Sequence, residues 1–444
     1  MSSFMPSFVR TLAFAATFAA VATIAQAQTL EDKLVIVTSF SKDLTVPFAQ
    51  AFEKKHPGTK VEVQNRNTAA AVAFIRETKS NPPDIMWASA PDAFEVLKKD
   101  KLLQAYKPQA PGVAEKVGSY PVNDPENFYT GFAASGYGIM YNTRYLRANS
   151  LPAPKEWDDL KKPIYAGHVG ISAPSRSGTT HLTVETLLQG EGWEKGWATL
   201  LEIGGNFAQV SDRSFGVPDA VNSGQYGIGI VIDFFGLSAK ASGFPVEFVY
   251  PTVTTLVPAN VGIIANAKHP NAAKAFVEFL LSDEGQQLLL DPKIQRLPVK
   301  ATAYAKAPAG YPNPFKDASL GARVTFDADV SEARYALLNS LFDRIITFRL
   351  KELNAAWKAI HEAEAKTKSA EAKKLIEEAR RLATAVPIGD KEAAEPAIAA
   401  SFKELKKGEK AAGRQAEFEE KWDSFAIAHY ADAKAMAEKA LAAK

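Results

Sequence analysis

Short apolar runs alternate, along the first hundred residues, with stretches whose apolar side chains recur every three or four positions. Residues 33–38 (KLVIVT) predict a strand. The spacing of Leu44, Phe48 and Phe52 predicts that a helix follows it to about residue 55. The alternation continues with a strand over 60–64, a helix over 69–78 and a strand over 84–87. Strands that alternate with helices indicate parallel pairing through helical crossovers, which is an α/β fold.

A second region of this kind follows an apolar, glycine-rich run at 131–141 (GFAASGYGIMY). Its expected elements are strand 168–172, helices 178–188 and 193–203, and strand 225–233. Beyond them, strand 261–265 and helix 271–281 are expected to return to the first region. Two α/β lobes joined by two crossings make a clamshell with a cleft, and ligands of such sheets bind beyond the carboxyl ends of the strands.

The last part of the chain has a different composition. Residues 351–444 contain 27 alanines and 35 charged residues, which favours helices, with breaks at 387–389 and 407–408. Apolar residues such as Leu353, Trp357 and Ile360 recur at helical spacing, so part of this extension packs on something. Two interpretations stay open: a helical cap with a solvated charged face, or a docking surface.

The first 27 residues are typical of a secretory signal peptide. Arg10 precedes an apolar run over 12–24, and Ala25-Gln26-Ala27 offers small residues at the cleavage site. We expect cleavage after Ala27 and release into a bacterial periplasm, the alternative being a buried N-terminal helix. The chain has no cysteine, which excludes a lipid anchor on a cysteine, disulfides and thiolate metal ligands.

The charge balance narrows the choice of partner. Of 52 basic residues only Arg10 lies in the leader, which leaves 51 basic against 50 acidic side chains. Nucleic-acid binding depends on clustered Lys and Arg, so a generally basic, nucleic-acid-coating surface is excluded and no nucleic-acid partner is expected.

The densest group of polar side chains stands between the strand at 168–172 and the helix at 178–188, in the turn SAPSRSGTTH. A helix N-terminus presents unpaired N–H groups and a positive dipole end, which together bind phosphate or carboxylate. Arg176 can add a bidentate charged contact, and Gly178 lets the backbone approach an anion. No Gly-Lys-Ser/Thr closes the turn, so it is not a nucleotide-hydrolysing loop. The alternative is that Ser177 is only an N-cap. The candidate ligands are Ser175, Arg176, Ser177, Gly178, Thr179 and Thr180.

Three further turns repeat this chemistry. Ser39 and Ser41 follow the first strand, Ser89 follows the strand at 84–87, and Arg213 lies in the polar turn 211–214. Singly, each serine can be a helix cap and Arg213 a surface ion-pair residue. Together, at the carboxyl ends of strands, they are expected to converge on one cleft.

Catalytic and metal motifs are missing from the sequence. The six histidines show no His-Glu-x-x-His spacing, and there is no Gly-x-Ser-x-Gly elbow. A hydrolase that uses Ser175 or Ser177 with His181 would need an orienting acid that no motif specifies. We therefore expect no enzyme, no catalytic residue, no metal site and no cofactor.

The pieces VIVTSF, DIMWAS, SGYGIMYN, SAPSRSGTTH, VIDFF and QRLPV, in this order over about residues 30–300, resemble periplasmic solute-binding proteins of ABC importers. The similar branch includes ferric-ion binders and binders of phosphorylated or phosphonate compounds. The resemblance implies a two-lobed, type II clamshell that closes on a ligand by a hinge and delivers it to an inner-membrane ABC permease; we expect a monomer. The expected lobes are 28–130 with 251–350, and 131–250, followed by the extension 351–444.

One departure from the resemblance concerns iron. In the ferric binders the strand corresponding to 229–235 ends in two tyrosines, and here these positions are Phe234 and Phe235. Phenyl rings cannot coordinate Fe(III), so a small phosphorylated or phosphonate organic anion is the expected ligand, with ferric ion as the alternative. Asp233 is expected to bind ligand hydroxyls or an amine, or else to be a buried hinge carboxylate. A second hypothesis is a sensing protein whose closed form is presented to a membrane sensor kinase.

Overall fold

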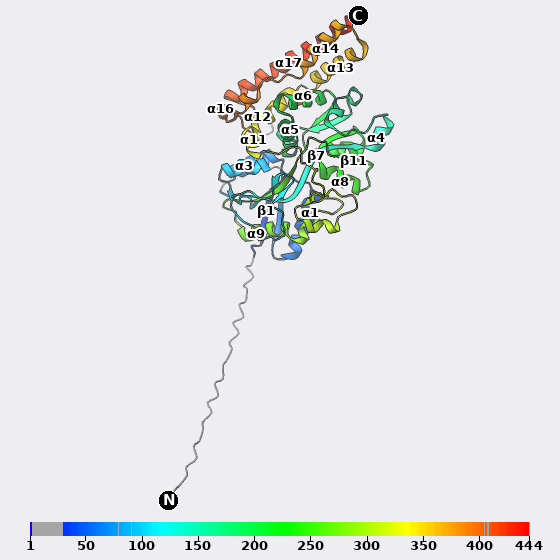
Figure 1. The fold of residues 1–444 in the computed structure, drawn as a ribbon. Helices are drawn as coiled ribbons and strands as arrows, with labels where there is room; N and C mark the ends of the chain where they lie inside the picture. Colours follow the sequence, from blue (N-terminus) through cyan, green and yellow to red (C-terminus); the bar gives the residue numbers. More distant parts are fainter. Residues whose placement is uncertain (2–29, 79, 90, 404, 406–407, 444) are drawn as a thin grey trace.

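The structure, a computed structural model, describes residues 1, 30–78, 80–89, 91–403, 405 and 408–443 (Figure 1). The expected signal peptide lies outside these residues, so its prediction is not tested. Among the described residues, no helix is both long and apolar enough to cross a membrane.

A mixed eleven-stranded sheet organises the chain, with β2-β1-β3-β12-β7-β10-β8-β9 as its main path. Its centre is the antiparallel pair β7 (Thr130–Asn142) and β12 (Leu256–Ile264). The apolar, glycine-rich run 131–141 is thus one long strand that passes between the lobes, and the predicted strand 261–265 covers only the second half of β12.

On one side of this pair lies what we call the first lobe. Its strands β1, β2 and β3 are parallel, as expected. They place their carboxyl ends, and the polar turns that follow, on one edge of the sheet. The elements are β1 Lys33–Thr38, α1 Lys42–Lys55, β2 Lys60–Asn65, α2 Thr68–Glu77, β3 Ile85–Ala88, α3 Pro91–Lys99, β4 Leu103–Gln104, α9 Pro270–Leu281, α10 Asp283–Leu288 and β13 Leu297–Pro298.

The second lobe is built on the other half of β7. The strand continues past Gly136 into pairing with β10, while β8 pairs in parallel with both β10 and β9. Gly136 and Gly138 allow close packing there, because an added Cβ at Gly138 would lie 2.2 Å from the carbonyl oxygen of Val249. The elements are α4 Thr143–Ala148, β8 Val169–Ser172, α5 Gly178–Glu191, α6 Trp193–Gly204, β9 Phe207–Ser211, α7 Gly216–Ser223, β10 Ile228–Ile232, α8 Asp233–Ala241 and β11 Val246–Val249.

After the sheet, the chain passes back to the second lobe. Helix α11 (Ala328–Ala333) contacts α3, whereas α12 (Tyr335–Phe342) and the π-helical turn Asp343–Thr347 pack in the same apolar core as Ile171, Val184 and Trp197. The lobe boundaries in the sequence stay a prediction. Six apolar side chains of the expected range 251–350, however, pack in the core that also holds Ile171, Val184 and Trp197: Leu337, Leu338, Leu341, Phe342, Ile345 and Ile346.

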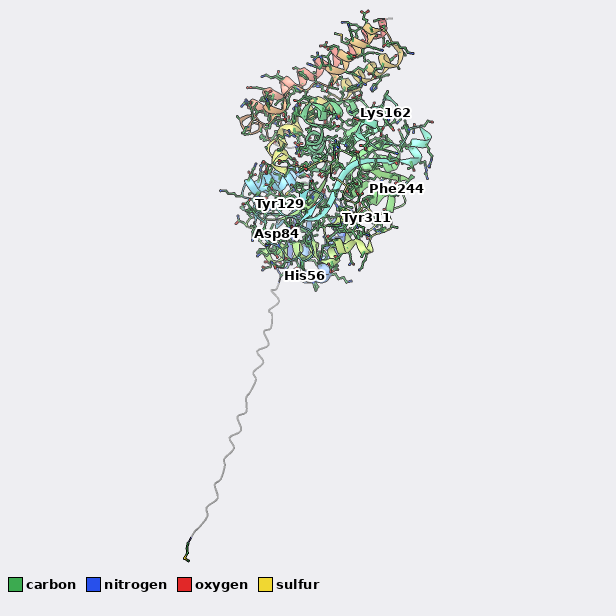
Figure 2. All side chains as sticks on the ribbon, viewed as in Figure 1. His56, Asp84, Tyr129, Lys162, Phe244 and Tyr311 are labelled. Atoms are coloured by element: carbon green, nitrogen blue, oxygen red, sulfur yellow. The ribbon has the colours of Figure 1, made fainter. Side chains whose placement is uncertain are left out.

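The C-terminal extension is helical, as expected from its composition. Helices α13 (Leu350–Lys366), α14 (Ala370–Ala383) and α17 (Gly413–Ala442) lie side by side at one end of the molecule, next to α6 (Figure 1). Trp357 of α13 is fully buried against Gly205, and Trp193 of α6 donates from Nε1 to the carbonyl of Ile388 at 2.9 Å. The extension therefore shares its core with the second lobe. Figure 2 labels residues of both lobes: His56 and Asp84 belong to the first lobe, and Lys162 and Phe244 belong to the second.

Candidate functional site

A cavity lies where the turns after β1 and β3 of the first lobe face the starts of α5 and α8 in the second. It encloses about 390 Å³ of space free of atoms, part of it open to solvent. Fifteen described residues line it: Ser39, Phe40, Ser41, Asn67, Thr68, Ser89, Arg176, Ser177, Thr179, Arg213, Ser214, Phe215, Phe234, Phe235 and Arg296. The structure thus brings together seven of the eleven residues predicted from the sequence, namely Ser39, Ser41, Ser89, Arg176, Ser177, Thr179 and Arg213.

Two helix N-termini, one from each lobe, supply hydroxyl groups to the cavity. Ser41 is the N-cap of α1 and makes no capping hydrogen bond with its side chain. Ser177 caps α5 by accepting from the backbone N–H of Thr180 at 3.2 Å, and it also lines the cavity. The interpretation of Ser177 as an N-cap is therefore confirmed, and its O–H remains able to donate to a ligand. Both helices turn their positive dipole ends toward the same space.

Arg296, which sequence reasoning did not single out, is the most unusual side chain of the cavity. Only 1% of it is exposed, and the atoms Nε and Nη1 have no hydrogen-bond partner among the described residues. Nη2 makes one long hydrogen bond, 3.4 Å, to Oγ of Ser89. The guanidinium lies between two rings, its carbon 4.5 Å from the centre of Phe40 and 3.8 Å from that of Phe234. Burial lowers the pKa of Arg296 to about 9, opposed by the charge of Asp233.

The two arginines predicted from the sequence lie at the same cavity but are less buried. Arg213 donates from Nη2 to Oδ1 of Asn65 at 3.1 Å, which joins the second lobe to the first, and burial lowers its pKa. Arg176 lines the cavity from the short 3₁₀ turn Pro174–Arg176. None of the fifteen lining residues is acidic, so the cavity carries three arginines with no carboxylate on its wall. Such a wall attracts an anion.

The other four predicted residues do not line the cavity. Thr180 points back to the hydroxyl of Ser172, and Gly178 is buried in the first turn of α5. Ser175 lines a separate pocket beside α12 and α17. Asp233 is fully buried and accepts hydrogen bonds from Gly136 N–H at 2.8 Å, Phe234 N–H at 2.7 Å and Tyr250 O–H at 2.9 Å. It is thus a buried carboxylate at the junction of the lobes, where burial raises its pKa to about 6.

The hydrolase alternative is not supported by the position of His181. The ring is fully buried in α5 and faces Asp92 and Ser331 through the same atom, Nε2, rather than a cavity serine. A base must reach its nucleophile and its orienting acid through different nitrogens. Among the described residues there is also no group of three or more His, Asp or Glu that could hold a metal ion.

A wider recess adjoins the cavity on its outer side. It shares Ser41, Phe215 and Phe235 with the cavity and is lined further by α1, α7 and α8. The recess encloses about 1330 Å³ of space free of atoms, part of it open to solvent, against about 390 Å³ for the cavity.

A two-lobed α/β fold with a polar cavity between the lobes defines a binding protein for a small solute. The sequence model of the family described as "Bacterial extracellular solute-binding protein" matches residues 80–319, more than half of the chain. The protein belongs to this family. Among curated proteins, the chain is 32% identical over 361 residues to the "Phosphoglycerate transport regulatory protein PgtC" of Salmonella typhimurium, covering 81% of this chain and 87% of the relative.

Two other likenesses concern sugar-phosphate and iron binders. The solved structure of the periplasmic binding protein AfuA from Actinobacillus pleuropneumoniae, with fructose-6-phosphate bound, superposes with a TM-score of 0.62 at 24% identity over 70% of this chain and 98% of AfuA. The "Fe(3+)-binding periplasmic protein" of Serratia marcescens is 25% identical over 60% of this chain and 78% of its own length. At these identities the comparison with AfuA carries the fold, which is the expected type II periplasmic-binding-protein fold.

Proposed function

We propose that this protein captures a small phosphorylated or phosphonate organic anion between its lobes and delivers it to an inner-membrane ABC permease. The observation that carries the proposal is Arg296, a buried guanidinium of which two atoms have no hydrogen-bond partner among the described residues, in a cavity whose fifteen described lining residues include no acid. Burying a charge without partners is costly, so the site is complete only when an anion enters it.

A phosphoryl or phosphonyl group fits this donor set well. It offers several acceptor oxygens and up to two negative charges, which the serine and threonine hydroxyls, the helix N-termini and the arginines can share. A lone carboxylate would leave more of these donors unpaired. The names of two similar proteins, one concerned with phosphoglycerate and one bound to fructose-6-phosphate, support the same class of ligand.

Ferric ion is the poorer candidate for this cavity. The first turn of α8, just after β10, carries Phe234 and Phe235, whose rings have no donor atom for a metal, and the remaining wall is cationic. Positive charge on the wall repels Fe(III) and favours an anion.

The test is a binding screen by thermal shift and calorimetry with 3-phosphoglycerate, fructose 6-phosphate, 2-aminoethylphosphonate, inorganic phosphate and ferric citrate. A ligand present at 100 times its dissociation constant stabilises the folded protein by about 2.7 kcal/mol. We expect at least one phosphorylated or phosphonate compound to bind with one-to-one stoichiometry. Stabilisation by ferric citrate alone would overturn the proposal.

Arginine variants locate the binding to the cavity. Arg296→Gln should abolish measurable binding, and Arg176→Ala should weaken it by about 2 kcal/mol, close to thirtyfold, because each removes a charged partner of the anion. Arg76→Gln is the matched control, since Arg76 is an exposed residue of α2 paired with Asp100. An unchanged affinity of Arg296→Gln would place the ligand elsewhere.

A second candidate function is sensing, in which the closed form acts on a membrane sensor kinase. The relative described as a transport regulatory protein favours it. The two functions differ in what a deletion changes: loss of a permease-dependent uptake indicates import, whereas unchanged uptake with a lost transcriptional response indicates sensing. We also propose a periplasmic location with cleavage after Ala27, so that the mature chain isolated from the periplasm would begin at Gln28.

A further inference from the structure

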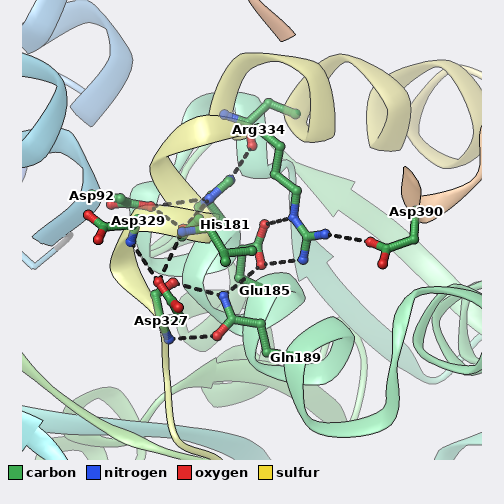
Figure 3. Close-up of polar contacts among 11 residues, drawn as sticks. Asp92, His181, Glu185, Gln189, Asp327, Asp329, Arg334 and Asp390 are labelled. Carbon is green, nitrogen blue, oxygen red and sulfur yellow. Dashed lines mark hydrogen bonds and ion pairs between the residues drawn. The ribbon is translucent and has the colours of Figure 1, made fainter. Parts of the chain in front are cut away.

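Anion donors of the cavity stand just before helices α3 and α5, which belong to different lobes. Ser89 lies two residues before Pro91, where α3 begins, and Ser177 directly precedes α5; both serines line the cavity. Behind this wall the first turns of the two helices meet, at Asp92 of α3 and His181 of α5 (Figure 3).

Asp92 and His181 form a closely matched buried pair. Both side chains are fully buried, and Nε2 of His181 lies 3.2 Å from Oδ2 of Asp92. The hydroxyl of Ser331, from α11, donates to the same carboxylate oxygen at 3.1 Å and lies 3.0 Å from Nε2. Side chains from the three helices α3, α5 and α11 therefore meet at one point.

The protons of this group can be counted. Nδ1 of His181 lies 2.7 Å from Oδ1 of Asn339, an acceptor, so Nδ1 carries a proton. Nε2 then faces a carboxylate, and the contact needs one more proton, on the imidazole or on the acid. Burial raises the pKa of Asp92 to about 6. Separating Asp92 from His181 would leave polar atoms unpaired in the interior.

The segment that follows the sheet reinforces the contact. The ring of Tyr335 packs on that of His181, with centres 4.2 Å apart. Arg334 donates to both carboxylate oxygens of Glu185, four residues along α5 from His181, at 2.8 and 2.9 Å. It also reaches Asp390 of the C-terminal extension at 3.2 Å (Figure 3). The His181 side of the contact is therefore held in place by Tyr335 and by the ion pair of Arg334 with Glu185.

We propose that Asp92 and His181 are positioning residues of the ligand site, which hold the first turns of α3 and α5 together in the closed form. In this way they set the separation of the anion donors contributed by the two lobes. The role of this pair in ligand binding rests on the proposed function, whereas the contact that it makes between the lobes does not. If the lobes open by a hinge, α3 and α5 move apart and the pair is broken. The contact between Asp92 and His181 therefore favours the closed form. The apparent affinity for a ligand depends on the fraction of the protein that is closed.

The test measures the distance between the lobes directly. Because the chain has no cysteine, spin labels can be placed at Lys54→Cys on α1 and Ser223→Cys on α7, both exposed, and their distance distribution recorded by pulsed electron resonance. Ser331→Ala, Asp92→Asn and His181→Gln are compared with the parent, each with and without 3-phosphoglycerate and fructose 6-phosphate. We expect each to lose population at the short, closed distance.

The control is a second histidine–aspartate pair that lies within one lobe. Nδ1 of His269 is 2.8 Å from Oδ2 of Asp84, and both belong to the first lobe. His269→Gln should lower the melting temperature but leave the distance distribution unchanged. Ser331→Ala removes a single oxygen, so a folded variant is available even where His181→Gln does not fold.

Two outcomes separate this inference from the proposed function. If no phosphorylated or phosphonate compound binds the parent but the variants still shift the distance distribution, the ligand class is wrong and the positioning pair stands. If a compound binds and its Kd rises about tenfold or more in Ser331→Ala and Asp92→Asn, but not in His269→Gln, both hold. Distance distributions that match the parent in all three variants overturn the inference.

Discussion

The guanidinium of Arg296 stacks on the ring of Phe234, at 3.8 Å from guanidinium carbon to ring centre. Phe234, in the first turn of α8, stands at a position where the ferric binders that the sequence resembles carry a tyrosine. Instead of a phenolate that binds a cation, the position offers a π-face that holds one. The same corner of the fold thus presents a positive charge to the cleft.

We expect Phe234→Leu to weaken binding of a phosphorylated ligand severalfold, because removal of the ring frees a guanidinium that it now orients. A desolvated cation–π contact contributes up to about 2 kcal/mol. Calorimetry measures the change in Kd. Phe235→Leu is the control: Phe235 lines the same cavity, but Arg296 stacks on Phe40 and Phe234. Equal losses in both variants would mean that only cavity shape matters.

Restoring tyrosines at both positions, with Phe234→Tyr and Phe235→Tyr, should not create a tight iron site. Iron needs several correctly placed ligands with their supporting hydrogen bonds, and here the neighbouring wall holds arginines. The measurement is visible absorption after addition of ferric citrate. A strong phenolate-to-iron band would show that the other ligands are already in place, contrary to our view of the cavity.

The sequence was informative about this site where its signal is local. Hydroxyl-rich turns at the ends of strands are visible as short motifs, and the α/β alternation says that they share one edge; Ser39, Ser89 and Ser177 accordingly reach one cavity. The sequence does not show which residues of a single turn face the cavity. Successive residues at a helix start point in different directions, so Thr179 faces the cavity while Thr180 turns inward to Ser172.

What the sequence could not give are the contacts made across long separations. Arg296 stands in the segment 295–299 (QRLPV), but only the fold places it between Phe40 and Phe234 and next to Ser89. The pairing of Asp92 with His181 has the same cause, since the two come from helices in different lobes. Gln295 precedes Arg296, and Lys293 and Lys300 stand nearby, so no local pattern of the sequence singles it out.

The buried carboxyl of Asp233 should leave a mark on the pH dependence of stability. Burial raises its pKa from 3.8 to about 6, so between these values the folded protein binds a proton that the unfolded chain does not. For this group, stability therefore falls as the pH rises through this window, with a slope of up to about 1.4 kcal/mol per pH unit. Asp233→Asn should reduce that slope.

Urea unfolding at several pH values between 4 and 7 measures the difference. The free energy of unfolding of Asp233→Asn, relative to the parent protein, should increase from pH 4 to pH 6 and then level off. Asp92 titrates in the same window, but it is present in both proteins and cancels in the difference. Parallel pH profiles would mean that Asp233 titrates alike in the folded and unfolded chains.

The C-terminal extension is predicted to be part of the second lobe's stability. Trp357 is fully buried, and its ring occupies the space in which Gly205 has no side chain. Trp357→Ala should cost about 3–5 kcal/mol in the free energy of unfolding. Phe348→Ala is the control, because Phe348 is 52% exposed and should cost little. A small loss in Trp357→Ala would favour an extension that folds independently.

The final prediction concerns closure on a ligand. The cavity takes donors from both lobes, with Ser39 and Arg296 on one side and Ser177 and Arg213 on the other. An anion that contacts both sets binds the closed form better than the open form, and only that difference shifts the population. Small-angle scattering should therefore show a smaller radius of gyration when a phosphorylated ligand is added. Arg213→Gln, which also loses the hydrogen bond to Asn65, should reduce the change, whereas Arg76→Gln should not. A scattering curve left unchanged by a ligand that calorimetry shows to bind would mean that capture does not involve movement of the lobes.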